Sequence, residues 1–463
     1  MTSLQPSGIV RKDSTRPNLP LAVYGTIIHS VSSSEIAIIE NSLLIVGTDG
    51  TIVLLQKDVV EEIVDELLSR HKVQHFRMLN NGEFLIPGFV DTHNHAPQWT
   101  QRGMGRGKNI MEWLNKITFP HEARFADPEY ARKTYASCVD GLIKQGITTA
   151  AYYGSLHGEA TKILADTCLE KGQRALVGKC NMNQSSPGFY KDSSAEESLR
   201  VTEDFIAYAR KIDPEFKLIT PILTPRFAIA CDREVLSGLG RIAAKNPDLP
   251  IQTHFNETIQ EMEVTKSLFP EFGNESDLYE HFGLLNDRSI LAHCIFMDDY
   301  DMGRLQDLGC GVSHCPISNT TGGDFGVAPI REYLRRDMNV GLGTDSGGGY
   351  SSSILDAMRQ AFIVSKARQL STDGADEPLS ICETFYLATL GGAKLCGLDS
   401  KIGTFAVGKD FDALEIKTSG EYEGVITFVE DFDSIANVFE KFIMSGDDRN
   451  IAKVYVKGRP IKN

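Results

Sequence analysis

The chain has 463 residues, of which 41% are hydrophobic and 24% charged, as is typical of a soluble globular protein with a large core. Its 47 Lys and Arg residues against 62 Asp and Glu residues give a formal net charge of −15, and no long basic run appears. Because this charge repels phosphate backbones and anionic lipids, we expect no nucleic-acid partner and no membrane partner. No apolar segment approaches the roughly 18 residues that a membrane-spanning helix needs.

Residues 1–18 are polar and contain Pro6, Gly8 and Pro17. We therefore expect a poorly ordered N-terminal arm, without the apolar core of a secretion signal. The nine Cys residues are scattered and form no C-x-x-C pair. This pattern favours reduced thiols over a disulfide framework and predicts a cytoplasmic location.

Residues 19–85 have the pattern of short β-strands, which we expect near 22–29, 41–47 and 51–55. Asp49-Gly50 is a hairpin turn signal between the last two, and an acidic helix is expected near Val59–Arg70. Residues 403–412 and 454–458 again have the pattern of turns and strands. We therefore expect residues 19–85 and 400–463 to build one small, discontinuous, β-sandwich-like domain from both chain ends.

Between residues 86 and 399, short apolar runs alternate with helical stretches. Helix starts are expected at the capping box Ser193–Glu196 and at Asp127-Pro128, where Asp caps and Pro opens the helix. Near-continuous apolar runs are typical of buried parallel strands. Eight candidate strands, alternating with helices, predict an α/β fold of the (β/α)₈ TIM-barrel type. They lie at 88–91, 148–152, 175–178, 218–222, 251–253, 290–292, 311–313 and 340–343.

Polar clusters follow four of these strands at their carboxyl ends, where TIM-barrel active sites lie. The first is Asp91-Thr-His93-Asn-His95, after the first strand. Because side chains two apart in a strand point the same way, His93 and His95 can bind one ion together. Taken alone, this H-x-H pair also fits two unrelated polar residues at a strand end.

Three later clusters can complete the site. After the fifth strand, His254 offers a third imidazole, and Glu257 can act as a general acid and base. After the sixth strand, His293 is either a ligand or a residue that handles protons beside the ion. After the eighth strand, Asp345 can bind the ion and accept a proton. The glycines at 347–349 let the backbone turn tightly or approach a ligand, and the run lacks the known phosphate-binding patterns.

Singly, each cluster also fits a buried histidine, a loop carboxylate or a turn cap. Their order on four strands of one barrel instead predicts a metal centre formed by His93, His95, His254 and Asp345. Three imidazoles and a carboxylate suit one Zn²⁺ per chain, with Fe²⁺ as the alternative. Such an ion makes hydroxide available at neutral pH, so the sequence predicts a metal-dependent hydrolase.

This order of motifs resembles the amidohydrolase superfamily over nearly the whole chain. No Lys stands at the end of the fourth strand, where two-metal members carry a carboxylated Lys, and this supports a single metal. Within the superfamily the chain is most similar to guanine deaminases. Asn94, Pro97 and Asn256 depart from the residues that relatives often carry, and they flank the expected functional positions. The matching segments are Pro87–Gln98, Glu112–Pro120, Thr224–Phe227, Gly341–Asp345, Ala388–Gly392 and Asp447–Asn450.

The resemblance implies a substrate, guanine, and residues that bind it. Gln98 and Arg226 would hydrogen-bond to the edges of the purine, and Phe227 would stack on its face. His254 would lie beside the substrate as well as bind the metal. Without the resemblance, Arg226 reads as a surface salt bridge and Phe227 as a core aromatic residue.

The resemblance also implies a reaction, the hydrolysis of guanine to xanthine and ammonia at a zinc ion. Glu257 would deliver a proton to a ring nitrogen, and Asp345 would take a second proton and pass it to the departing amine. His293 would steady the attacking water or the developing charge. A homodimer is implied by analogy with the family.

Two other functions stay open on the sequence alone. A related hydrolase would use the same metal centre on another amino-purine, a pterin or a triazine, and Gln98, Arg226 and the loop Trp99–Pro120 would decide between these substrates. A catalytically dead interaction scaffold is a remote alternative, because every ligand position survives.

Overall fold

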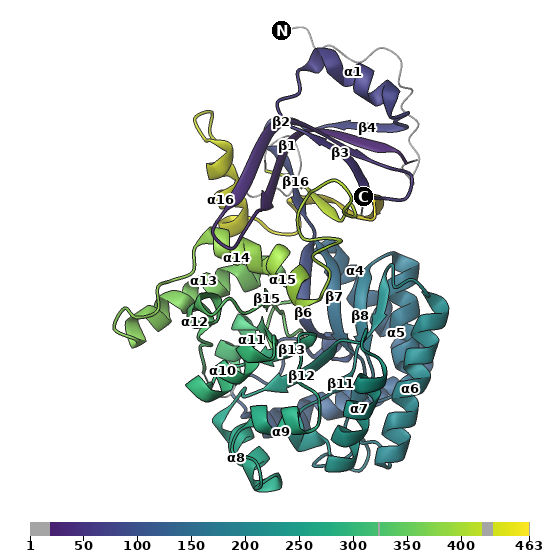
Figure 1. Cartoon of the computed structure of the whole chain (residues 1–463), viewed down its shortest axis with the longest axis vertical. Coiled ribbons are helices and arrows are strands. Elements are labelled where there is room, and N and C mark those ends of the chain that lie inside the picture. The colour runs from purple at the N-terminus through teal and green to yellow at the C-terminus, as the bar shows by residue number, and fades with distance from the viewer. Residues whose placement is uncertain (1–18, 323–324, 419–428, 463) are drawn as a thin grey trace.

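The structure is a computed structural model that describes residues 19–322, 325–418 and 429–462. The predicted N-terminal arm, residues 1–18, lies outside the described residues. Figure 1 shows a small β-rich part next to a larger part in which helices surround a core of strands. Among the described helices, none combines the length and apolar character needed to cross a bilayer.

Two four-stranded parallel sheets form the barrel, in the orders β10-β8-β7-β6 and β12-β13-β14-β15. A parallel bridge between Leu223 and Ile251 joins the sheets on one side. On the other side, the amide of Asp345 donates to the carbonyl of His93 over 2.9 Å. The strands are β6 (Phe89–His95), β7 (Ile147–Tyr153), β8 (Arg174–Gly178), β10 (Ile219–Pro221), β12 (Ile251–Phe255), β13 (Ser289–His293), β14 (Gly311–His314) and β15 (Val340–Leu342).

The eight strands expected from the sequence are therefore confirmed, within a few residues at their ends. They form here because short, β-branched or small apolar runs can be buried on both faces of a parallel sheet. Every residue of β7, for example, is buried. Two short strands that pair with each other, β9 (Cys180–Asn181) and β11 (Thr224–Pro225), follow β8 and β10.

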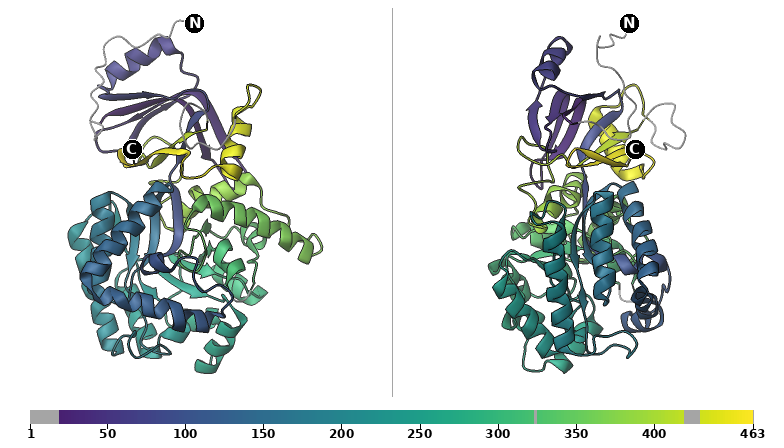
Figure 2. Two further views of the ribbon diagram at one scale, coloured as in Figure 1. Left: turned by 180° about the vertical axis from the view of Figure 1, so that it is seen from behind. Right: turned by 90° about the vertical axis from the view of Figure 1, so that its right-hand side faces the viewer.

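Helices cover the outside of the barrel, as Figures 1 and 2 show. Asp127 caps α4 with Pro128 at its first position, as expected. The capping prediction at Ser193 was wrong by one residue, because Ser194 accepts from the amide of Glu197 and caps α6. The long helices are α4 (Pro128–Lys144), α5 (Gly158–Lys171), α6 (Ala195–Ile212), α7 (Arg233–Lys245), α8 (Ile259–Leu268) and α13 (Ile354–Ser371). Shorter helices are α9 (Glu275–His281), α10 (Asp299–Asp307), α11 (Pro316–Thr321), α12 (Ile330–Arg335), α14 (Ile381–Ala388) and α15 (Leu390–Leu395).

A largely helical region lies between β6 and α4. It comprises a 3₁₀ turn η1 (Ala96–Gln101), α2 (Ile110–Trp113), a π-helical turn η2 (Leu114–Thr118), α3 (Phe119–Glu122) and a 3₁₀ turn η3 (Ala123–Ala126). Another 3₁₀ turn, η4 (Ala228–Ala230), follows β11. π-Helical turns are rare and often occur at functional sites.

Strands from both chain ends form a separate mixed sheet in the order β18-β17-β16-β5-β1-β2-β3, with β4 also paired to β1. The sandwich-like domain that we expected thus contains one sheet, and α1 packs on one of its faces through Val64, Leu67 and Leu68. The domain boundaries stay a prediction. The elements are β1 (Leu21–Ser30), β2 (Ile36–Val46), β3 (Ile52–Gln56), α1 (Glu61–Arg70), β4 (His75–Met78), β5 (Glu83–Pro87), β16 (Ala413–Lys417), α16 (Ile435–Ser445), β17 (Ile451–Val456) and β18 (Arg459–Lys462).

The mixed sheet adjoins the amino ends of the barrel strands, because β6 begins two residues after β5 ends. A buried ion-pair network joins the two parts. Arg174, at the start of β8, lies 2.9 Å from Asp410 and 3.1 Å from Asp412, and Lys457 lies 2.6 Å from Asp410. The carboxyl ends of the barrel strands therefore face away from the mixed sheet (Figure 2).

Candidate active site

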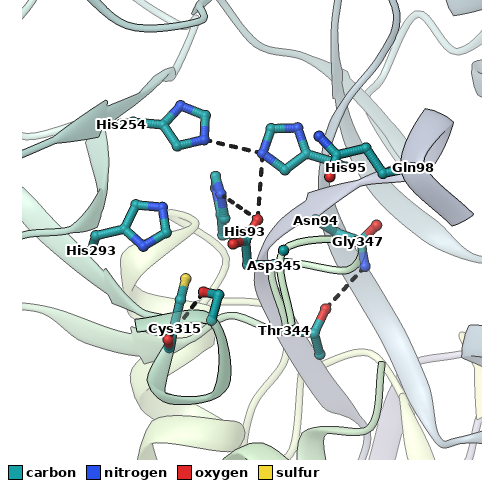
Figure 3. A network of polar contacts seen from close by, with 12 residues as sticks. His93, Asn94, His95, Gln98, His254, His293, Cys315, Thr344, Asp345 and Gly347 are labelled. Atoms are coloured by element: carbon teal, nitrogen blue, oxygen red, sulfur yellow. Dashed lines mark hydrogen bonds and ion pairs between the residues drawn. The ribbon is translucent and has the colours of Figure 1, made fainter. Parts of the chain in front are cut away.

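Four predicted metal ligands meet at the carboxyl end of the barrel (Figure 3). His93 and His95 both belong to β6, which continues through them. The Nε2 atoms of His93 and His95 lie 3.3 Å and 3.5 Å from Oδ1 of Asp345. The Nε2 atoms of His95 and His254 are 3.1 Å apart. The sequence pattern and the barrel thus bring three imidazoles and one carboxylate to one point.

Hydrogen bonds on the far side of two rings fix their tautomers. Nδ1 of His254 donates to the carbonyl of Arg226 over 2.5 Å, which leaves Nε2 as the free acceptor atom. Nδ1 of His293 lies 2.8 Å from Oδ1 of Asn319. A metal-binding histidine usually has such a partner on its second nitrogen.

These residues fit a metal ion. The ligand atoms of His93, His95 and His254 lie within 4.8 Å of one another, and so do those of His93, His293 and Asp345. Nε2 of His93 and of His293 are buried and make no hydrogen bond among the described residues, although carboxylate oxygens of Asp345 and Glu257 lie 3.3 Å and 3.7 Å from them. Buried polar atoms rarely lack hydrogen bonds, so this arrangement of imidazoles and carboxylates indicates a metal-binding group.

The electrostatics of the group also suit a cation. Burial, followed by the charge of neighbouring histidines, holds the pKa values of His95 and His254 well below the usual range, so both rings stay neutral. Burial alone would raise the pKa of Asp345, but His93 and His95 hold it well below its ordinary value. Neutral imidazoles and an ionised carboxylate are the forms that bind metals.

Unusual backbone conformations place the side chains that follow the strands. His293 and Asp345 have φ of 76° and 44°, in the left-handed region that β-carbon-bearing residues rarely adopt. Such strain is held by the surrounding structure and often marks functional sites. The glycine run serves close packing: a Cβ at Gly348 would lie 2.2 Å from Oδ2 of Asp345, and one at Gly347 would lie 2.3 Å from Cβ of Gln98.

Asp91 ties the first strand to the loop after the last one. It is fully buried and accepts three hydrogen bonds. The donors are the backbone amide of Thr344 at 2.9 Å, the hydroxyl of Thr344 at 2.6 Å and the side-chain amide of Asn94 at 2.9 Å. Burial raises the pKa of Asp91 to about 6. These bonds fix His93 and Asp345, the neighbours of the two segments, relative to each other.

Glu257 lies beside the metal-binding group, just before α8. Its Oε2 atom is 3.7 Å from Nε2 of His293. Its amide donates to Glu261 over 2.8 Å, and Glu261 also forms the capping box of α8 with Thr258. Burial disfavours charge on His293, but Glu257 and Asp345 raise its pKa above the usual value. The helix start thus holds Glu257 where it can exchange protons with the site.

The predicted purine-binding residues form one buried cluster. Gln98 comes from η1, and Arg226 and Phe227 follow β11. Arg226 makes a two-pronged ion pair with Glu122, at 2.7 Å and 3.1 Å, and Gln98 donates to Glu122 over 2.9 Å. Burial would lower the pKa of Arg226, but the Glu122 charge raises it, so the guanidinium is charged.

One cleft, the active-site cleft, connects these groups. It is lined by Gln98, Arg226 and Phe227 together with His95, His254, Glu257, His293 and Asp345. His93 is buried and is not among the residues that line this cleft. The helical region after β6 supplies further wall residues, Arg106, Met111, Trp113 and Leu114. This is part of the loop that we expected to influence substrate choice.

Comparison with known proteins places the chain in a family. The model of the amidohydrolase family matches residues 84–461. The chain is 40% identical over 437 residues to a probable guanine deaminase of Schizosaccharomyces pombe, covering 94% of this chain and 82% of that protein. It is 38% identical over 449 residues to the guanine deaminase of Dictyostelium discoideum, covering 95% and 97%. The chain belongs to the amidohydrolase family, in its guanine deaminase group.

A solved amidohydrolase has the same overall structure. The crystal structure of guanine deaminase from C. acetobutylicum with guanine bound in the active site matches with a TM-score of 0.86 and 34% sequence identity. The match covers 95% of this chain and 99% of that one. The predicted fold and the predicted membership of the amidohydrolases are therefore confirmed.

Sequence reasoning missed two buried partners of the amidohydrolase site. Glu122 follows the matching segment Glu112–Pro120 by two residues, and that proximity was the available signal. Asn319, in α11, had no signal, since an Asn in a helix start is common on surfaces. Cys294 and Cys315 also lie near this site, and both are buried, which raises their pKa values well above the usual range.

Proposed function

We propose that this chain catalyses the hydrolytic deamination of guanine to xanthine and ammonia. One observation carries the proposal: a single cleft is lined both by the metal-binding group and by the cluster of Gln98, Arg226 and Phe227. A metal-activated water and a planar, polar base can meet there. The guanine-containing structure of the C. acetobutylicum relative supports the choice of substrate.

The ion that fits best is zinc, bound by His93, His95, His254 and Asp345. Three imidazoles and one carboxylate form a ligand set of borderline softness, which suits Zn²⁺ and, as the alternative, Fe²⁺. When bound, the ion supplies Lewis-acid activation of water at neutral pH. Metal analysis of the purified protein distinguishes the two ions.

The purine would be recognised by shape, stacking and hydrogen bonds. Phe227 lies close to His254, with ring centroids 6.1 Å apart, and its face can cover a flat base. Arg226 offers donors to the carbonyl and ring-nitrogen acceptors of guanine, and Gln98 offers an acceptor to an N–H group. His254 lines the same cleft and would contact the substrate as well as the ion.

Proton transfer would be handled by three side chains. In the reaction, a C–O bond forms at C2 of guanine and the bond from C2 to the amino nitrogen breaks. Glu257 takes one proton of the attacking water and delivers it to a ring nitrogen, and Asp345 takes the second proton of that water and passes it to the amino group, which leaves as ammonia. His293, with its raised pKa, stabilises the negative charge that develops next to it.

A substrate panel with an ammonia readout tests the proposal. We expect ammonia from guanine, with xanthine as product, and at least about 100-fold lower kcat/KM for adenine, pterin and triazine substrates, because a site built for particular hydrogen bonds rejects analogues that leave them unpaired. Zinc content is measured on the same sample. Turnover confined to a pterin or a triazine would contradict the proposal, and a metal-free, inert protein would favour the scaffold alternative.

Two further features belong to the same proposal. We infer a homodimer by analogy with the family, which size-exclusion chromatography with light scattering tests. We also infer a cytoplasmic enzyme, in line with the buried, unpaired thiols of eight of the nine cysteines. Imaging of a tagged chain checks the location.

A further inference from the structure

Glu122 has an unusual position for a carboxylate. It lies at the end of α3, is fully buried and is not part of the cleft wall. Its hydrogen bonds go to two residues of the wall: Oε1 accepts from Gln98 and from Arg226, and Oε2 accepts from Arg226. A buried charge is stable only when it is paired in this way.

The carboxylate fixes how the side-chain amide of Gln98 is turned. An ionised carboxylate only accepts hydrogen bonds, so the NH₂ group of Gln98 must point to Glu122. The other end, Oε1, is buried without a hydrogen-bond partner among the described residues. An unpaired buried acceptor lowers the stability of the fold, so Oε1 of Gln98 is available to accept a hydrogen bond from an N–H group of the substrate.

The same carboxylate also fixes Arg226. Its two terminal nitrogens face the two oxygens of Glu122, and the guanidinium packs 5.2 Å from the centre of the Phe119 ring, three residues before Glu122. The ion pair neutralises a guanidinium that lines the cleft, which suits an uncharged base. Nη1 also faces the sulfur atoms of Met182 and Cys180, at 3.8 Å and 4.0 Å, so the N–H groups that remain for the substrate are on Nη2 and Nε.

We propose that Glu122 is a positioning residue for purine recognition, which locks Gln98 as an acceptor and Arg226 as a donor toward one substrate. This inference rests on the proposed function and deepens it. It explains how the cleft selects a base with an N–H group next to hydrogen-bond acceptors. Glu122 does not line the cleft, so it would act on the substrate only through Gln98 and Arg226.

The decisive variant is Glu122→Gln, which keeps the shape and replaces one acceptor with a donor. The new NH₂ group faces a donor on either Gln98 or Arg226, so the orientation of these two side chains is no longer fixed. We expect KM for guanine to rise about 30-fold or more, with kcat within about threefold and zinc content unchanged. A merely structural role would lower kcat and zinc content and leave KM unchanged.

A double-mutant cycle tests whether Glu122 acts through Gln98. In a Gln98→Ala background, Glu122→Gln should raise KM clearly less than it does in the wild-type background, since coupled residues are not additive. Equal effects in both backgrounds would overturn the inference. Glu129→Gln, an exposed change on α4, is the matched control and should leave KM within twofold.

The outcomes separate this inference from the proposed function. If the wild-type chain releases no ammonia from guanine, the proposed function fails and the inference fails with it. If the wild type is active and KM is unchanged in Glu122→Gln, only the inference fails. Should Glu122→Gln not fold, Glu122→Asp retains the charge at a longer distance, and an unchanged KM in that variant overturns the inference equally.

Discussion

The chemistry of single residues depends on where the fold forces their backbones. His293 and Asp345 have left-handed φ values at the ends of their strands, and Glu257 precedes a capped helix. Each is fixed by neighbours that do not themselves react, such as Asn319 and Glu261. The roles of the side chains therefore depend on a supporting layer around the ligands.

The role of Glu257 in proton transfer is tested by Glu257→Gln, which keeps the shape and removes the titratable group. We expect kcat to fall about 10²–10⁴-fold, since that is the usual contribution of general acid–base catalysis. Zinc content should stay normal, because Glu257 is not one of the four expected ligands. Steady-state kinetics with parallel metal analysis measures both, and near-normal turnover would refute the assignment.

The ion pair between Arg226 and Glu122 makes a prediction about stability. Arg226→Ala leaves the Glu122 charge buried and unpaired, so we expect a loss of about 3–5 kcal/mol in the free energy of unfolding. The double variant Arg226→Ala with Glu122→Gln removes the unpaired charge and should recover a large part of this loss. Urea denaturation compares the two, and equal stability of single and double variants would argue against the pairing.

Some residues of the candidate site could be predicted from the sequence, and others could not. His93 and His95 could be found because strand periodicity and spacing place them together. Glu122 could not, because a Glu in a short helix looks like a surface residue. Its burial comes from contact with Arg226, which lies 104 positions away in the chain.

At the level of elements, the sequence pattern predicted the positions of the barrel strands, because a short apolar run between turn-forming residues favours a buried strand. The start of α6 was less well defined, since Ser193 and Ser194 are both suitable caps. Ser194 caps the helix while Glu197 bonds back to the Ser193 amide, and this choice depends on geometry rather than on residue type. The glycine run was expected to turn tightly or to approach a ligand. It forms a tight turn, in which the amides of Gly348 and Gly349 donate to the carbonyl of Asp345, and it packs against Gln98 and Asp345.

The loop after β15 makes a prediction of its own. Gly348→Ala would place a Cβ 2.2 Å from Oδ2 of Asp345, so the carboxylate would have to move away from its position beside the histidines. We expect zinc affinity to fall about 10–100-fold, as when other supports of metal ligands are lost. Competition with a chelator measures the affinity. Gly188→Ala, which has open space around the new carbon, is the control and should bind zinc normally.

For the whole molecule, the junction between barrel and mixed sheet depends on Arg174. Replacing it with Met leaves the carboxylates of Asp410 and Asp412 without their buried partner. We expect the free energy of unfolding to fall by about 3–5 kcal/mol. In contrast, Arg200→Met breaks only an exposed pair with Asp204 and should change it by less than about 1 kcal/mol. Chemical denaturation that finds equal effects would contradict a central role for the junction.

The mixed sheet has a consequence for how the chain is made. β5 ends at Pro87, and its neighbour β16 begins at Ala413, so the ribosome must complete the barrel before this edge can be paired. At about 5–20 residues per second, synthesis of the intervening segment takes tens of seconds. During that time β5 is an open strand edge, of the kind that recruits other chains. The edge of β5 is therefore covered only when the last strands of the chain have been made. A chain truncated before β16 should aggregate rather than form a stable shortened enzyme.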